Sequence, residues 1–267
     1  MMKADHLDAL IQQWTQLGAG FGSESDDERH AQSHASTPDL ERLLLDTARA
    51  APAMARLFIM AATWLHTYGD LVAKHRLKRL IRDELETEHR ATLGILLDIA
   101  QQGTHPLELE SVVKTLAPAA QARPLFDSER AHELLVARVQ RYATPISRRW
   151  RLWTGPIELK DDAIRPPRWV MRMNPQLITR ADFRGDLRAS ILASLQFDKD
   201  KGAADSELSL ARAAGGSRAQ IRNALDNLEL SGRVKRRPAR ERSPGERAAL
   251  KAPKIGRRVA IELVGLA

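Results

Sequence analysis

The sequence contains no cysteine among its 267 residues. This absence excludes a disulfide framework, a thiolate zinc site, an iron–sulfur cluster and a cysteine nucleophile, and it agrees with a reducing compartment. Aromatic residues are also few, at 4%. The most apolar stretch, residues 57–65, is far shorter than the roughly 20 residues that span a bilayer. The first residues lack the apolar core and cleavage site of a secretion signal. We therefore expect a soluble cytoplasmic protein without membrane contacts.

Enzyme motifs are missing as well. There is no glycine-rich loop ending in Lys-Ser/Thr and no G-x-S-x-G elbow. His30 and His34 have the spacing of two metal ligands on one helical face, but no third ligand is close in sequence. Arg82 and His89 match the loose Arg-x(4–6)-His spacing of HEPN-type ribonucleases, although their acidic neighbours would repel RNA. We expect no catalytic residue, metal or cofactor, and keep a HEPN-like ribonuclease as a minor alternative.

The net positive charge comes entirely from one end of the chain. The net charge is +8, from 42 basic and 34 acidic side chains. Residues 1–179 hold 23 of each sign, whereas residues 180–267 hold 19 basic and 11 acidic side chains. A polyanionic partner is therefore expected to contact the C-terminal third.

The first two thirds of the chain are predicted to be mainly helical. Apolar residues recur at helical spacing, prolines and glycines separate the segments, and β-branched alternation is missing. Trp150 and Trp153 lie in an arginine-rich stretch; they could stack on nucleotides, but packing against a domain surface is the better interpretation. The predicted segments are an N-terminal helix (1–17), a flexible linker (18–37), a helical domain (38–142) and a Pro/Trp/Arg-rich connector (143–179). The residues Thr37-Pro38-Asp39 have the pattern of a helix start and open the helical domain.

Residues 180–267 have a more specific pattern. A small residue, Ala211, is followed four positions later by Gly215, as required where two helices cross and the chain turns with positive φ. Ser217 and Gln220 have the spacing of a capping box for a second helix, which Gly232 ends. Two short strands are predicted around 233–236 and 257–263, with a long basic segment between them.

The polar face of the second helix suits the reading of base edges, because arginine pairs with guanine, and Gln or Asn with adenine. The candidates for base contacts are Arg218, Gln220, Arg222 and Asn223. The candidates for contacts to the DNA backbone are Ser217, Lys235, Arg236, Arg237, Arg240, Arg242, Lys251, Lys254 and Arg257.

Residues 182–264 resemble a winged helix-turn-helix domain of prokaryotic transcription regulators. The resemblance rests on Leu210 to Ser217, Ile221 to Leu228 and Ser231 to Val234, and the wing is longer than is common. It implies a mainly α fold with a small β-hairpin wing, one helix in the major groove and the wing over the backbone. We expect a nucleoid-associated regulator that binds double-stranded DNA as a homodimer and acts by operator occupancy. The alternative is a DNA-binding adaptor of a phage-defence or plasmid-maintenance assembly, with protein partners on the helical domain.

Overall fold

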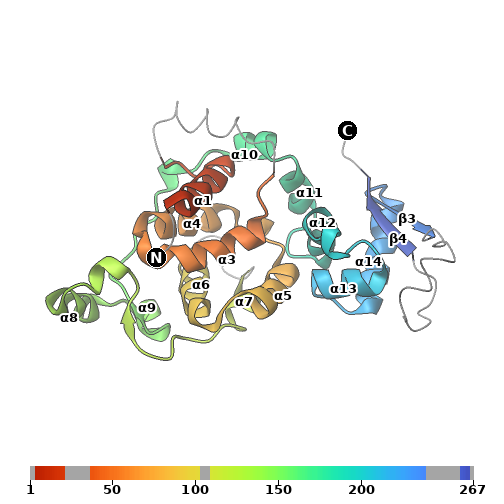
Figure 1. The fold of residues 1–267 in the computed structure, drawn as a ribbon. Helices are drawn as coiled ribbons and strands as arrows, with labels where there is room; N and C mark the ends of the chain where they lie inside the picture. Colours follow the sequence, from red (N-terminus) through yellow and green to blue (C-terminus); the bar gives the residue numbers. More distant parts are fainter. Residues whose placement is uncertain (1–3, 22–36, 103–108, 239–258, 265–267) are drawn as a thin grey trace. The chain divides into compact units, whose positions relative to one another are not determined.

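A computed structural model describes residues 4–21, 37–102, 109–238 and 259–264 of the chain. The fold is mainly helical, with a small antiparallel sheet near the C-terminus. Internal contacts divide the chain into two units, Met1–Gly185 (unit 1) and Asp186–Ala267 (unit 2). Both are drawn in Figure 1, and each is described by itself below.

Unit 1 consists of short helices around a single apolar core. Its helices are α1 (Ala4–Gln16), α3 (Leu40–Ala50), α4 (Ala55–Tyr68), α5 (Lys74–Glu84), α6 (Thr87–Ala100), α7 (Glu110–Val113), α8 (Glu133–Tyr142), α9 (Pro145–Arg149), α10 (Pro167–Met173) and α11 (Gln176–Asp182). Two very short strands, β1 (Arg123–Pro124) and β2 (Leu152–Trp153), pair in parallel.

Tryptophans join the first helix to this core. The apolar face predicted for residues 1–17 is present, and both Trp14 and Leu17 are completely buried. The indole N–H of Trp14 donates to Thr47 Oγ1 at 2.9 Å, and that of Trp64 donates to the Leu17 carbonyl at 2.8 Å. Each buried indole therefore has a hydrogen-bond partner, as the desolvation cost of an N–H group requires.

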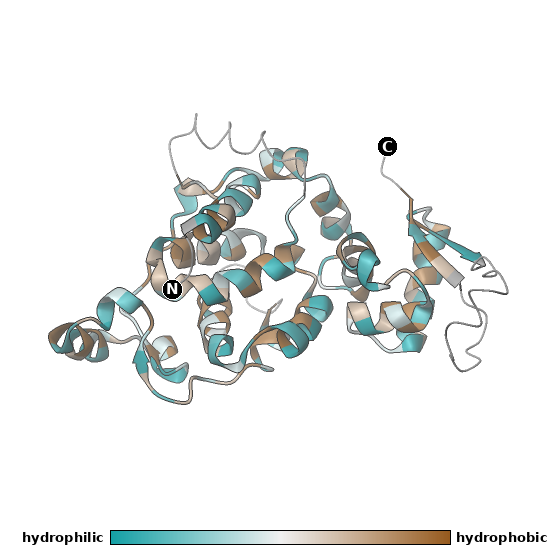
Figure 2. Cartoon of the chain, viewed as in Figure 1, coloured by the Kyte–Doolittle hydropathy of each residue, from teal (hydrophilic) through white to brown (hydrophobic). Residues whose placement is uncertain are grey.

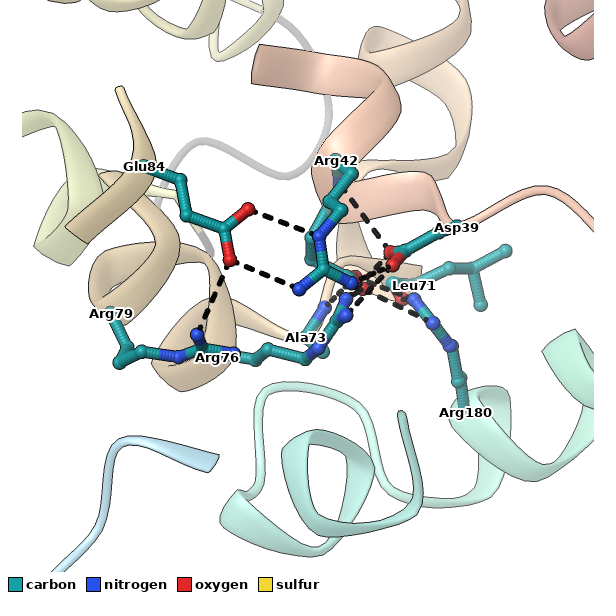
Figure 3. Close-up of polar contacts among 9 residues, drawn as sticks. Asp39, Arg42, Leu71, Ala73, Arg76, Arg79, Glu84 and Arg180 are labelled. Carbon is teal, nitrogen blue, oxygen red and sulfur yellow. Dashed lines mark hydrogen bonds and ion pairs between the residues drawn. The ribbon is translucent and has the colours of Figure 1, made fainter. Parts of the chain in front are cut away.

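A buried ion network connects α3, α5 and α11 (Figure 3). Glu41 and Arg76 are completely buried, and Arg180 is 3% exposed. The Glu41 carboxylate accepts from the Ala73 amide at 2.8 Å, from Arg76 at 2.9 Å and from Arg180 at 2.6 and 3.2 Å. Arg76 also donates to both carboxylate oxygens of Asp39, at 2.6 and 2.8 Å. Charges separated by up to 139 positions thus hold three helices together.

Asp39 also begins α3, because its side chain accepts from the Arg42 amide as the N-cap. Burial alone would raise the pKa of Asp39, but hydrogen bonds and charge from Arg76, with the charge of Arg42, outweigh burial and lower that pKa below its ordinary 3.8. The helix start predicted at Thr37-Pro38-Asp39 is therefore present, with Asp39 as the capping residue.

Two of the predicted segments of unit 1 are corrected by the structure. The linker predicted over 18–37 begins as packed chain: Gly18 and Ala19 are buried, and backbone hydrogen bonds join this stretch to residues 163–165. Residues 22–36 lie outside the described residues. The connector predicted over 143–179 contains α9, α10 and α11, and Trp150 is 2% exposed with its N–H on Asp98. The prediction that Trp150 packs against the domain, and is not free to stack on nucleotides, is thus confirmed.

Helix α8 differs from the other long helices of unit 1 because none of its residues is buried. Leu134 is 74% exposed and Tyr142 is 61% exposed. Figure 2 colours part of this helix as hydrophobic. Amphipathic spacing predicts an apolar face, but it does not predict whether the same chain covers that face.

Unit 2 is a three-helix cluster followed by an antiparallel strand pair. Its elements are α12 (Leu187–Phe197), α13 (Glu207–Ala214), α14 (Arg218–Leu230), β3 (Val234–Pro238) and β4 (Val259–Leu263). The helices pack on one another, β4 contacts α12, and β3 contacts α14. Val234 pairs with Leu263 in the register of the strands. The Ile261 amide also donates to the Ala204 carbonyl, which joins β4 to the segment before α13.

The boundary between the units lies six residues later than the predicted one. Arg180 binds Glu41 of α3, and Arg184 pairs with Asp70 at 3.0 Å, so residues 180–185 belong to unit 1. The change in composition near residue 180 marks the start of the charge excess, whereas the contacts of residues 180–185, these ion pairs among them, lie within unit 1.

Candidate nucleic-acid interface

The connection between α13 and α14 has the predicted geometry. Gly215 ends α13 with φ of +79°, a left-handed conformation that costs a glycine little. Ala211 is 6% exposed in α13, which packs against α14. Ser217 Oγ accepts from the Gln220 amide at 3.3 Å, and Gln220 Oε1 accepts from the Ser217 amide at 3.0 Å. The capping box predicted for this position is confirmed.

Helix α14 has one buried and one exposed face. Ile221, Leu225 and Leu228 are completely buried in unit 2. All four candidates for base contacts are exposed on this helix, namely Arg218, Gln220, Arg222 and Asn223. At about 100° per residue, Arg218 and Arg222 lie on the same side of α14, whereas Gln220 lies on a different side, and its side-chain oxygen is occupied by the cap. The amide N–H groups of Gln220 remain available as donors to a ligand.

A carboxylate on α13 lies at the centre of the arginines of this face. Glu207 is the first residue of α13, and its side chain is only 15% exposed. Its Oε2 atom accepts from Nε and Nη2 of Arg222 at 3.3 and 3.2 Å. The same oxygen is 3.6 Å from Nε of Arg218, and Oε1 is 3.9 Å from Nη1 of Arg236. Residues of α13, α14 and β3 thus share one negative charge.

Arg236 of β3 is held by two further carboxylates, both on α14. Its Nη2 atom is 2.6 Å from Asp226 Oδ1, and its Nε donates to Glu229 Oε2 at 2.9 Å. The hydrogen bonds that the Arg236 side chain and amide donate to Glu229 lower the pKa of Glu229 below its ordinary 4.5. Glu229 is therefore ionised at neutral pH. Arg236, with 22% of its side chain exposed, is less available to a phosphate than its position in the sequence indicates.

The other backbone candidates differ in availability. Ser217 is exposed, but its hydroxyl accepts the cap hydrogen bond. Lys235 is exposed on β3, and Arg237 is 63% exposed beside Glu262 of β4 at 3.4 Å. The remaining candidates lie outside the described residues, namely Arg240, Arg242, Lys251, Lys254 and Arg257.

Charge on the described part of unit 2 is nearly balanced. Residues 186–238 and 259–264 hold 10 basic and 8 acidic side chains. Residues 239–258 add 7 basic and 2 acidic side chains to the sequence of this unit. Most of the positive excess is therefore carried by residues 239–258, and the face of α14 is a mixed array of arginines and carboxylates.

The alternative sites gain no support from their surroundings. Arg82 pairs with Asp83 at 2.7 Å, and the His89 ring is 3.2 Å from Glu88, so each is placed beside a carboxylate. His30 and His34 lie outside the described residues. Within the described ranges, no group of three or more potential ligands could hold a metal ion. None of the helices in those ranges is long and apolar enough to cross a membrane.

Comparisons with protein-family models, curated proteins and solved structures found no match to this chain.

Sequence reasoning identified the arginines of this face but missed the carboxylates that hold them. Glu207 is 15 positions from Arg222, and the contact exists only because the turn at Gly215 folds α13 back onto α14. Glu229 and Arg236 are 7 positions apart across the end of a helix. The signal available in the sequence was the acidic residue at the start of α13, which is also explained by the helix dipole alone.

Proposed function

We propose that the protein binds double-stranded DNA through unit 2 and acts as a prokaryotic transcription regulator by occupying an operator. In this proposal unit 2 is a winged helix-turn-helix domain, α14 enters the major groove, and β3, β4 and the residues between them form the wing. The proposal assigns the protein no reaction and no cofactor.

The observation that carries the proposal is the exposed face of α14. Arg218, Arg222 and Asn223 are exposed on this helix, and the strand β3, which contacts α14, carries the exposed Lys235 and Arg237. Arginine and asparagine can form bidentate pairs with guanine and adenine in the major groove. A helix with one side buried in unit 2 and the other exposed has the form needed to enter that groove, which admits one α-helix.

The two groups of side chains have separate roles in this proposal. Arg222 and Asn223 read bases and thereby set sequence preference. Lys235, Arg237 and the basic residues between the strands contact phosphates, which position the protein but carry no direct sequence information. A homodimer would place two copies of α14 about one helical turn of DNA apart, on a palindromic operator.

Selection of bound fragments from sheared genomic DNA, followed by sequencing, tests the proposal. We expect an enriched sequence, most simply an inverted repeat. Arg222→Ala or Asn223→Ala should each cost about 1–3 kcal/mol of binding free energy on that sequence and little on random duplex. Equal losses on both duplexes would reduce these residues to backbone contacts, and no duplex binding by the wild type would contradict the proposal.

Helix α8 favours a second candidate function, a DNA-binding adaptor that docks another protein of a phage-defence or plasmid-maintenance assembly. Leu134 and Tyr142 form exposed apolar surface on a helix with no buried residue. Arg138 and Arg141, together with Tyr142, line a surface hollow of about 450 Å³. This combination fits a partner with an apolar, acidic surface, because the two arginines would pair with its carboxylates.

Leu134→Lys tests the adaptor function. A protein that co-purifies with the wild type should be lost from the variant, and the purified partner should bind the wild type directly with a weaker signal at high salt. DNA binding should be unchanged. If the substitution instead converts a homodimer to a monomer in sedimentation velocity, the surface is occupied by a second copy of this chain and not by an acidic partner.

A further inference from the structure

We infer that Glu207 is a specificity-determining residue of the proposed DNA interface: it holds Arg222 in the orientation that reads guanine and weakens binding to all other duplexes. The inference rests on the proposed function and concerns a residue of α13 outside the polar face of α14. Its basis is the position of one largely buried carboxylate among three arginines.

The geometry leaves one edge of Arg222 available for a base. A guanidinium carries five N–H donors in one plane. Glu207 Oε2 accepts from Nε and Nη2, which is the lateral edge of that plane. The end edge, formed by Nη1 and the second N–H of Nη2, stays available. Two parallel donors of this kind match O6 and N7 of guanine.

The same carboxylate restricts where Arg222 can go. The Arg222 side chain is 55% exposed and, without Glu207, would rotate among many conformations. Fixing it before DNA arrives lowers the entropy cost of forming the guanine pair. Arg222 pinned in this way is also less free to swing toward a phosphate, which is the contact that a random duplex offers.

Glu207 also acts on DNA of any sequence through its charge. Its carboxylate is only 15% exposed and lies between Arg218, Arg222 and Arg236, on the face proposed to meet the polyanion. It offsets part of their positive charge and repels phosphates at short range. A correct guanine contact compensates for this repulsion, and a random sequence does not. Both effects increase the ratio of specific to non-specific affinity.

Glu207→Gln in the full-length protein tests the inference. Its dissociation constants are measured by fluorescence anisotropy, at one salt concentration, on the selected sequence and on a random duplex of equal length. We expect tighter binding to the random duplex, no gain on the selected sequence, and therefore a specificity ratio lower by about 10-fold. A repeated selection with the variant should show a relaxed preference at one guanine, which a purely structural role would not produce.

Asp226→Asn is the matched control. It removes the same charge from the same face, but Asp226 contacts Arg236 and not Arg222. It should tighten binding to both duplexes by the same factor and leave the ratio unchanged. Glu207→Asp retains the charge and should recover part of the ratio. If Glu207→Gln does not fold, Glu207→Asp serves alone, because its shorter side chain keeps the charge but draws the carboxylate away from Arg222, and the ratio should still fall below that of the wild type.

Three results would overturn the inference. Glu207→Gln could change both affinities by the same factor, Asp226→Asn could lower the ratio as much as Glu207→Gln does, or selection with the wild type could enrich no sequence although a random duplex is bound. In all three cases DNA binding itself would stand. The proposed function fails separately, if the wild type shows no duplex affinity that falls with salt.

Discussion

Replacing Glu41 by glutamine is expected to destabilise unit 1 strongly, because it removes the only carboxylate hydrogen-bonded to Arg180 among the described residues. Arg76 retains Asp39, at 2.6 and 2.8 Å. Arg180, 3% exposed, then faces a neutral amide oxygen and the Leu71 carbonyl at 3.4 Å, and no carboxylate neutralises its charge. An uncompensated buried charge costs about 3–5 kcal/mol when its partner is removed.

Urea unfolding followed by tryptophan fluorescence measures the loss of stability of unit 1 in Glu41→Gln. All five tryptophans precede residue 186, so the signal reports unit 1 even if unit 2 unfolds separately. Glu84→Gln is the matched control on the same network. Its carboxylate is 29% exposed and pairs with Arg42 at 3.0 Å, so we expect a loss of about 1 kcal/mol or less.

A double-mutant cycle of Glu41→Gln and Arg180→Met shows whether the lost stability comes from the interaction between Glu41 and Arg180. Arg180→Met leaves Glu41 with Arg76 and the Ala73 amide, so it should cost less than Glu41→Gln. The double variant should be more stable than the sum of the single effects predicts, by at least about 1 kcal/mol. A Glu41→Gln loss below about 1 kcal/mol, or strictly additive effects, would refute the role of the network.

Further predictions concern both units. The pKa of Asp39 is lowered in the folded state, so its carboxylate stabilises unit 1 above about pH 4 and this contribution is lost as the pH falls through the folded pKa; the stability of Asp39→Asn in the same urea assay should therefore depend less steeply on pH below about pH 4. Gly94→Ala should cost about 1–3 kcal/mol in the same urea assay, since a Cβ there would lie 2.2 Å from the Trp150 ring, and an unchanged midpoint would contradict this packing. Ser217→Ala should lower the stability of unit 2 by about 0.5–2 kcal/mol, measured by hydrogen exchange of α14 amides, because it removes the cap. Arg236→Ala should reduce duplex affinity less than Lys235→Ala does, since Arg236 is held by carboxylates.

The local elements of unit 2 could be predicted because their signals are local. Gly215, Ser217 and Gln220 act within a few residues of one another, and the turn and the cap depend only on backbone conformation and short hydrogen bonds. The strands β3 and β4 could also be predicted from short runs of residues near 234 and 259. The arrangement of the helices, by contrast, depends on contacts that spacing alone does not specify.

The ion pairs could not be predicted because their partners are distant in sequence. Arg180 looks like the start of a basic domain, yet its charge is used by Glu41 in the first helical region. Arg222 looks free to contact DNA, yet it pairs with Glu207. Composition counts charges, but only the fold decides which of them neutralise one another. The exposure of α8 could not be predicted either, because the spacing of its apolar residues predicts a helix but not whether another part of the chain covers them.

A salt titration of duplex binding shows whether the DNA-binding surface proposed for unit 2 lies there. Three full-length proteins are compared: the wild type, a variant with four exposed basic residues of unit 2 replaced by alanine, and a control with four exposed arginines of unit 1 replaced in the same way. The unit 2 variant changes Arg218, Arg222, Lys235 and Arg237, and the control changes Arg138, Arg141, Arg168 and Arg172.

Both variants lose four positive charges, so a difference between them reports location and not net charge. We expect the slope of log K against log salt to flatten by up to about 0.9 per lost contact in the unit 2 variant. The unit 1 control should keep the wild-type slope and nearly the wild-type affinity. Equal slopes in the wild type and the unit 2 variant, with a flattened slope in the unit 1 control, would contradict the account.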